Sequence, residues 1–316
     1  MTWPQGATRD ERLEDARRTH GLDVLLALTP ENATYLSGLT NYVATHWRVP
    51  GLFSVAAGAN GRAVATSDFA VDPAAPSEHA IKTYASWAEV VDVRGVAGGS
   101  IEERVRTARP GPIDRPAQFD FDAVARTVVE AIRAVDPNPR RIGADLALVD
   151  AGTLARLRAL LPNAEWVDAT GVFADLRAIK DPEEIARLRL AAELAQAGIA
   201  GAVSRLALGQ TELAVNANYQ IAVLELAAND PRFAAFRQAE GGAAVGFGAA
   251  SRHVVAPGET IKFDVTVDVG GYHSDLGRTY AIAPTNEQRA VHAALLGTLR
   301  AMTAAAKPGV AVSELH

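Results

Sequence analysis

Residues 261–280 read IKFDVTVDVGGYHSDLGRTY, and this stretch decides how the second half of the chain folds. Apolar and polar residues alternate along its first half, which predicts a strand whose buried face is formed by Ile261, Phe263, Val265 and Val267. The glycines at 270 and 271 predict a tight turn into a second, antiparallel strand. Asp264 and Asp275 are eleven residues apart, so they fall on one face of the hairpin, opposite or diagonal to each other.

Two carboxylates at this separation repel each other when both are ionised, unless a proton or a cation lies between them. Aspartate and glycine are also the usual residues of turns, and an acidic hairpin is often simply solvated. The spacing of Asp264 and Asp275 alone therefore leaves two interpretations open, a metal site and a solvated hairpin.

The letters around these aspartates favour the metal site. Residues 271–280, GYHSDLGRTY, follow another aspartate at a fixed distance and so resemble the "pita-bread" metallopeptidase family. This family contains Xaa-Pro aminopeptidases, prolidases, methionine aminopeptidases and the metal-free creatinases. The resemblance implies that Asp264 and Asp275 are ligands of two divalent metal ions (Mn²⁺, Zn²⁺ or Co²⁺), which activate a water molecule for attack on a short peptide with proline in second place.

The histidines fit this resemblance less well. Family peptidases usually carry a substrate-binding histidine in the loop before the hairpin, at a position that corresponds here to Phe247 or Gly248. His253 is the nearest histidine in that loop, and we expect it either to substitute catalytically or to be a surface residue. His273, two residues before Asp275, shares its strand face and is the second catalytic candidate, with a solvated strand histidine as the alternative.

Thr266 is a further departure, because the family commonly has glycine two residues after its first aspartate. These differences weigh against ordinary Xaa-Pro specificity more than against metal binding. They keep open a second hypothesis, hydrolysis of a non-peptide C–N bond in a small amide, as in creatinase. A third hypothesis is a catalytically inactive domain of the same fold that binds protein partners.

Composition excludes several other classes of function. The net charge of −6 and the lack of a dense Lys/Arg stripe argue against nucleic-acid binding. The chain has no cysteine, which excludes disulfides and thiolate metal sites. No signal peptide or membrane-spanning run is evident, so we expect a cytoplasmic protein without a membrane partner.

Helix and strand signals predict two domains. Strands alternating with helices over residues 1–167 indicate an α/β domain, and its residues 12–38 resemble the N-terminal domain of creatinases and prolidases. Residues 168–181 are expected to be a linker. Asp181 and Pro182 then start a helix, and residues 182–316 are expected to form an α+β pita-bread domain, roughly its first half.

The resemblance implies more ligands than this chain shows. The family takes one histidine and two glutamates from the second half of its catalytic domain, and none of their motifs follows Asp275. We therefore expect a truncated form that binds metal weakly and is inactive by itself. The resemblance also implies a homodimer, with the loop around His46 and Trp47 reaching a neighbour.

Overall fold

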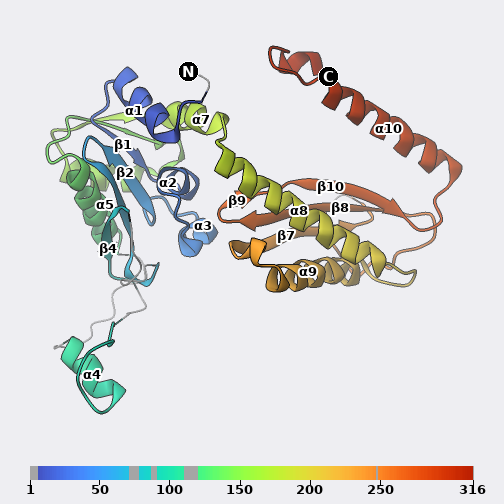
Figure 1. The fold of residues 1–316 in the computed structure, drawn as a ribbon, viewed down its shortest axis with the longest axis horizontal. Coiled ribbons are helices and arrows are strands. Elements are labelled where there is room, and N and C mark those ends of the chain that lie inside the picture. Colours follow the sequence, from blue (N-terminus) through green and yellow to red (C-terminus); the bar gives the residue numbers. More distant parts are fainter. Residues whose placement is uncertain (1–5, 71–77, 87–90, 110–119, 247, 316) are drawn as a thin grey trace. The chain divides into compact units, whose positions relative to one another are not determined.

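The computed structural model describes residues 6–70, 78–86, 91–109, 120–246 and 248–315, so Phe247 lies outside the described residues. The chain divides into two compact units, Met1–Pro182 and Glu183–His316, each with its own sheet (Figure 1). In the described part of the chain, none of the helices is both long and apolar enough to span a bilayer.

The first unit is built on a six-stranded sheet with the strand order β4-β3-β2-β1-β5-β6. The central strand β1 pairs in parallel with β5 and antiparallel with β2, and β2 and β3 form a hairpin. The outer strands β4 and β6 pair in parallel with β3 and β5. The strands are β1 (Val24–Ala27), β2 (Ser54–Gly58), β3 (Gly61–Ser67), β4 (Ala80–Tyr84), β5 (Arg141–Ala144) and β6 (Glu165–Asp168).

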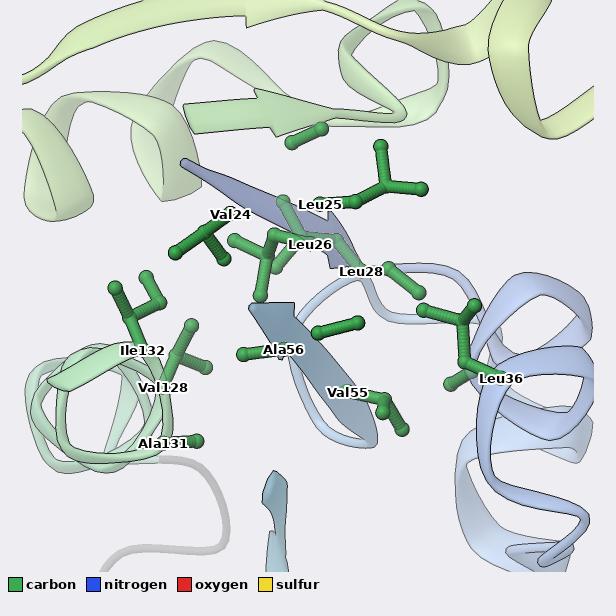
Figure 2. Packing of buried hydrophobic residues seen from close by; sticks show 14 of the residues in the cluster. Val24, Leu25, Leu26, Leu28, Leu36, Val55, Ala56, Val128, Ala131 and Ile132 are labelled. Carbon is green, nitrogen blue, oxygen red and sulfur yellow. The ribbon is translucent and has the colours of Figure 1, made fainter. Parts of the chain in front are cut away.

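The centre of this sheet is buried on both faces. All four residues of β1 are fully buried, as expected for a strand in the middle of a layered α/β domain. Side chains of β1 and of α5 (Phe121–Val135) meet in the core, where Val128 and Ile132 pack beside Val24 and Leu26 (Figure 2). The remaining helices are α1 (Arg9–Thr19), α2 (Pro30–Ser37), α3 (Tyr42–Trp47), α4 (Ile101–Ala108), α6 (Ala151–Leu160) and α7 (Thr170–Ala178).

A buried carboxylate ties β1 to the helix that follows it. Asp145 is fully buried, and it accepts hydrogen bonds from the backbone N–H groups of Leu28 and Thr29, the Thr29 hydroxyl and the Asn32 amide. These groups lie in the short connection between β1 and α2 and in the first turn of α2. Asp145 therefore fixes the point at which the chain leaves the sheet.

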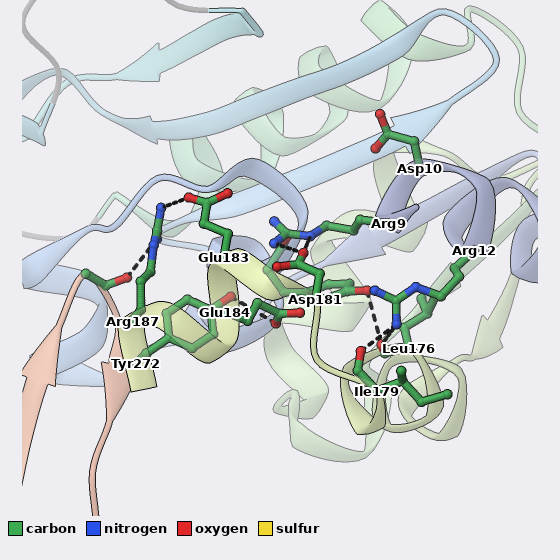
Figure 3. Close-up of polar contacts among 12 residues, drawn as sticks. Arg9, Asp10, Arg12, Leu176, Ile179, Asp181, Glu183, Glu184, Arg187 and Tyr272 are labelled. Atoms are coloured by element: carbon green, nitrogen blue, oxygen red, sulfur yellow. Dashed lines mark hydrogen bonds and ion pairs between the residues drawn. The ribbon is translucent and has the colours of Figure 1, made fainter. Parts of the chain in front are cut away.

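Most of the segment expected as a linker belongs to the first unit. Residues 170–178 form α7, whose Phe173 and Leu176 are buried in the core. The guanidinium of Arg12, itself buried, donates to the backbone carbonyls of Leu176 and Ile179 (Figure 3). The N-cap residue of this helix, Ala169, makes no capping hydrogen bond with its side chain. The helix is therefore stabilised by its buried apolar side chains rather than by an N-cap.

The second unit has a smaller sheet with the order β10-β8-β7, and β9 pairs with β8. All these pairings are antiparallel. Residues 241–244, shortly before the loop position of Phe247, belong to β7. The elements are α8 (Pro182–Ser204), α9 (Glu212–Asn229), β7 (Phe236–Ala244), β8 (Thr260–Val269), β9 (Tyr272–His273), β10 (Leu276–Ala281) and α10 (Asn286–Ala305).

Helices α8 and α9 cover one face of this sheet (Figure 1). They contact each other closely, because a Cβ atom on Gly198 would lie 2.4 Å from Val223, and one on Gly201 would lie 2.5 Å from Ala222. Their buried side chains pack on the odd-numbered residues of β8, which are all buried (Ile261, Phe263, Val265, Val267 and Val269). The opposite face of β8 is left for polar residues.

Candidate metal centre

The hairpin that carries both aspartates turns within two residues. Gly270 and Gly271 have φ values of 61° and 83°, and positive φ at both central positions is the requirement of a type I′ turn. The carboxylate of Asp268, which is buried, accepts a hydrogen bond of 2.7 Å from the N–H of Gly271. Residues with a Cβ atom would be strained here, so the glycines are a steric requirement of the turn.

The turn is anchored to the first residues of α8. The Tyr272 hydroxyl donates to the buried carboxylate of Glu184 over 3.0 Å, and Arg187 donates to the carbonyl of Gly270 over 3.2 Å (Figure 3). The Arg187 guanidinium also lies 5.5 Å from the centre of the Tyr272 ring, within the range of a cation–π contact. These contacts fix the hairpin on a rigid helix.

Asp264 and Asp275 lie on the same side of the hairpin. Asp264 pairs with Gly277, and Val265 pairs with Leu276. Asp275 lies in the gap between β9 and β10, and because the pairs on both sides of the gap share one register, its position falls opposite Thr266. Residues two apart on a strand share a face, which places Asp264 diagonally across from Asp275. Both aspartates are exposed, on the face opposite the helix-packed residues.

Small residues surround Asp264. Its partner on the other neighbouring strand is Gly242, and the adjacent Gly241 has a φ of 80°. A Cβ atom on Gly241 would lie 2.1 Å from the backbone oxygen of Asp264, so only glycine allows the strands to approach this closely. Lys262, on the same face, places its Nζ 3.5 Å from the Asp264 carboxylate and partly compensates its charge.

His273 shares the face of Asp275 but is close to a different carboxylate. It pairs with Asp268, and its Nε2 lies 3.9 Å from Asp268 Oδ2. The side chain is exposed.

His253 is engaged by a glutamate of its own loop. Its Nε2 lies 3.0 and 2.9 Å from the two carboxylate oxygens of Glu259. This hydrogen bond raises the pKa of His253 above its ordinary value. The pKa of Glu259 is lowered, first by the N–H of Ala256 and then by His253.

Glu212 is a residue that the sequence analysis missed. It is buried at the start of α9, where its carboxylate accepts hydrogen bonds from the N–H of Val245 and from both the N–H and the hydroxyl of Ser251. Burial raises its pKa, but the bonds from Ser251 and Val245 outweigh burial, and the net effect is a lowered pKa. Its place after the N-cap Thr211 was visible in the sequence, but its partners, 33 and 39 residues away, were not.

The ligand set for a metal centre is incomplete in the described residues. They contain no group of three or more histidine, cysteine, aspartate or glutamate side chains placed to hold a metal ion. Asp264 and Asp275 offer carboxylate oxygens that suit Mn²⁺, Zn²⁺ or Co²⁺, but such ions take four or more ligands. Two carboxylates fit part of a dinuclear centre and do not complete one.

Known protein families account for both units. Residues 9–179 match the creatinase/prolidase N-terminal domain, and residues 186–316 match metallopeptidase family M24. The chain belongs to the creatinase/prolidase family. Its first unit is the α/β N-terminal domain, and its second is part of the pita-bread domain, as the sequence predicted.

Comparison with individual proteins supports the same family assignment. An Xaa-Pro dipeptidase of Pyrococcus furiosus is 30% identical over 152 residues, which span 48% of this chain and 44% of that protein. Among solved structures, the prolidase of Pyrococcus horikoshii OT3 superimposes with a TM-score of 0.68 at 15% identity, covering 97% of this chain and 74% of that one. The X-Pro aminopeptidase of Thermotoga maritima has a TM-score of 0.66 at 19% identity, covering 95% of this chain and 74% of that one. The match thus spans less than half the length of the curated relative.

Proposed function

We propose that this creatinase/prolidase family member is a metal-dependent hydrolase of short Xaa-Pro peptides, and that Asp264 and Asp275 are two of its metal ligands. The observation that carries the proposal is the pair of exposed carboxylates on one face of a helix-anchored hairpin. Two carboxylates that lie diagonally on one exposed face can both reach a shared cation, which supports a ligand role over a solvated turn. The dipeptidases among the relatives support the choice of substrate.

The residues of this chain would bind the metal ions and hold their ligands in position. Asp264 and Asp275 would hold the ions from one side, with the glycines at 241 and 242 leaving the neighbouring strand without side-chain bulk. Bound divalent ions supply an activated water and polarise the scissile carbonyl. The rigid attachment of the turn to α8 keeps the two carboxylates at a fixed separation, which metal ligation requires.

One observation favours a substrate other than a simple Xaa-Pro dipeptide. Thr266 lies on the same face of β8 as Asp264, two residues further along the strand, and opposite the position of Asp275 in the register that β9 and β10 share. A β-branched hydroxyl side chain at this position narrows the space beside the ligands and adds a hydrogen-bonding group. Hydrolysis of a small non-peptide amide, as by creatinase, is therefore the second candidate.

Metal titration tests the ligand assignment. We expect Mn²⁺ to bind this chain weakly, without hydrolysis of an Xaa-Pro dipeptide, because two carboxylates supply too few donors. In a form of the chain extended by the second half of the family's catalytic domain, we expect tight binding and hydrolysis, both abolished by Asp275→Asn, which removes an anionic ligand at nearly constant volume. Calorimetry and dipeptide cleavage measure the two effects.

The matched control is Glu287→Gln, which removes one exposed carboxylate from α10 in the same unit. It should change neither binding nor cleavage. Tight binding of two metal ions by residues 1–316 alone would show that other side chains complete the site. Unchanged metal binding in the Asp275→Asn variant of the extended form would rule out the assignment.

A further inference from the structure

The strand that carries Asp275 is interrupted just before it. β9 and β10 both pair with β8, and only Ser274 and Asp275 separate them. The pairing register is the same on both sides of the gap, so no extra residue is inserted and the interruption is not a β-bulge. The backbone at Ser274 and Asp275 must instead be turned out of the regular ladder, as the flanking pairs Asp268–His273 and Val265–Leu276 show.

The side chain of Ser274 causes this turn. In a regular antiparallel pair, two opposite residues exchange both of their N–H···O=C bonds. Ser274 donates its N–H to the carbonyl of Val267 over 3.0 Å, as the regular pattern requires. The N–H of Val267, however, donates to the Ser274 hydroxyl oxygen, also over 3.0 Å. The hydroxyl thus occupies the place of the Ser274 carbonyl, which is displaced from the ladder.

Burial makes this exchange stable. Ser274 is only 6% exposed, and Val267 is fully buried. A buried N–H needs an acceptor, and the hydroxyl supplies one without the help of the backbone. The Ser274 carbonyl and the Asp275 N–H belong to the same planar peptide group. Displacement of the carbonyl therefore changes the orientation of the Asp275 N–H as well.

We propose that Ser274 is a positioning residue that sets the backbone orientation of Asp275, a candidate metal ligand, by replacing its own carbonyl in the ladder with its hydroxyl. The link to the metal rests on the proposed function, whereas the link from the hydroxyl to the orientation of Asp275 does not. Without the hydroxyl, the simplest way to satisfy Val267 is to rotate the 274–275 peptide back into the ladder. β9 and β10 would then join into one regular strand, and Asp275 would turn with them.

The test compares Ser274→Ala with Ser274→Thr by NMR of the isotope-labelled chain. The ³J coupling between the amide and Hα protons of Asp275 reports its φ angle, and hydrogen exchange reports the protection of the Val267 amide. In Ser274→Ala we expect the Asp275 coupling and amide shift to change while Val267 stays protected by the rotated carbonyl. Ser274→Thr keeps the hydroxyl and should restore the wild-type values.

Tyr272→Phe is the matched control, because it loosens the hairpin from α8 without changing Ser274. It should leave the Asp275 coupling unchanged. Mn²⁺ then serves as the metal probe, through its paramagnetic broadening of nearby amide signals. In Ser274→Ala we expect Mn²⁺ affinity to fall about tenfold, as when a residue that orients a metal ligand is lost. Broadening at Asp275 should weaken more than broadening at Asp264.

An unchanged Asp275 coupling in folded Ser274→Ala would overturn the proposal, since the hydroxyl would then be only a local hydrogen-bond partner. So would a Ser274→Thr form that shifts Asp275 as far as alanine does. If Ser274→Ala does not fold, Ser274→Cys, with a weaker acceptor of similar size, provides the same comparison. Absence of Mn²⁺ broadening at both aspartates in the wild-type chain would count against the proposed function, while the coupling data would still decide the role of Ser274.

Discussion

Asp145 places a carboxylate at a fully buried position, where four hydrogen-bond donors replace the water that it loses on folding. Asparagine at this position would retain one acceptor oxygen and direct an NH₂ group at N–H and O–H donors. We expect Asp145→Asn to lower the free energy of unfolding by about 3 kcal/mol, because buried donors lose their acceptor. Urea unfolding measures the change.

The control for this prediction is Asp120→Asn. Asp120 is an exposed N-cap residue of α5 and accepts from the N–H groups of Asp122 and Ala123. Asparagine caps helices about as well as aspartate, so the change should stay below about 0.5 kcal/mol. Equal effects at both positions would mean that the donors around Asp145 find other partners.

The His253–Glu259 pair should make the loop before β8 sensitive to pH. The pKa of His253 is raised, so its contribution is full below the ordinary value of 6.5 and is lost as the pH rises through the raised value. The pKa of Glu259 is lowered, so its contribution is present above the ordinary 4.5 and is lost as the pH falls through the lowered value. Both groups therefore contribute fully at pH values between these two ordinary pKa values.

We expect Glu259→Gln to return the pKa of His253 toward 6.5, since Glu259 is the first cause of the shift. NMR titration of the His253 ring protons measures this. Glu240→Gln, an exposed carboxylate on β7, should leave the titration unchanged. A His253 titration unaffected by Glu259→Gln would show that the contact does not persist in solution.

At the same scale, the sequence predicted which residues share a face of the hairpin but not which partners the loop residues have. The face of Asp264 follows from strand alternation, a local property, and the Gly270–Gly271 turn follows from backbone sterics. The contacts of Glu212 with Val245 and Ser251 depend on how α9 packs against the loop. No local pattern encodes that packing.

Among the elements, the contact between α8 and α9 depends on glycines. A Cβ atom on Gly198 would overlap Val223 and Tyr219, at 2.4 and 2.9 Å. Alanine favours helices over glycine by about 1 kcal/mol, but forcing an extra methyl group into a packed core costs about 1–3 kcal/mol. We expect Gly198→Ala to destabilise the protein, as measured by thermal or urea unfolding.

Gly297→Ala separates packing from helix propensity. Gly297 lies in α10, and a Cβ atom there would meet no neighbouring side chain within 4 Å, in contrast to Gly198. Helix propensity should then dominate and stabilise the protein by up to about 1 kcal/mol. A stabilising Gly198→Ala would show that the two helices separate easily.

The elements with strong local signals were predicted closely, and those defined by tertiary packing were not. The start of α8 at Pro182 was predicted from Asp181 and Pro182, a local signal of a helix N-terminus. Residues 168–181 were expected to be a linker, but residues 170–178 form α7, which is defined by the burial of Phe173 and Leu176 and has no capping side chain at Ala169. Gly241 in β7 is likewise a matter of tertiary packing, because only a residue without a Cβ atom allows the close strand contact with Asp264.

For the whole molecule, family membership and the fold class were predictable because the motif around Asp275 is long and specific. The remaining ligands were not, since the described residues bring no third acidic or histidine side chain to the two aspartates. A metal centre assembled from distant segments leaves only part of its pattern in any one stretch of sequence. The oligomeric state is a further property of this kind, and it stays a prediction.

We expect a homodimer formed through α3 of the first unit. Tyr42 is 64% exposed and stacks on His46 at 5.7 Å, and Trp47 is 38% exposed at the end of the same helix. Arg48 follows in the left-handed conformation and forms an ion pair with Glu31. Exposed aromatic residues beside an arginine are enriched at protein interfaces.

Sedimentation velocity at micromolar concentration tests this expectation, and Trp47→Ala combined with Tyr42→Ala should shift the protein toward monomer. Leu148→Ala is the control, because it removes a side chain of the same unit that is 59% exposed without touching α3. Central aromatic residues contribute a large part of interface energy, so the double variant should weaken association by at least about tenfold. A wild-type chain that sediments as a monomer at tens of micromolar, about the range in which weak specific dimers still form, would contradict the dimer. An unchanged dimer in the double variant would place the interface elsewhere on the surface.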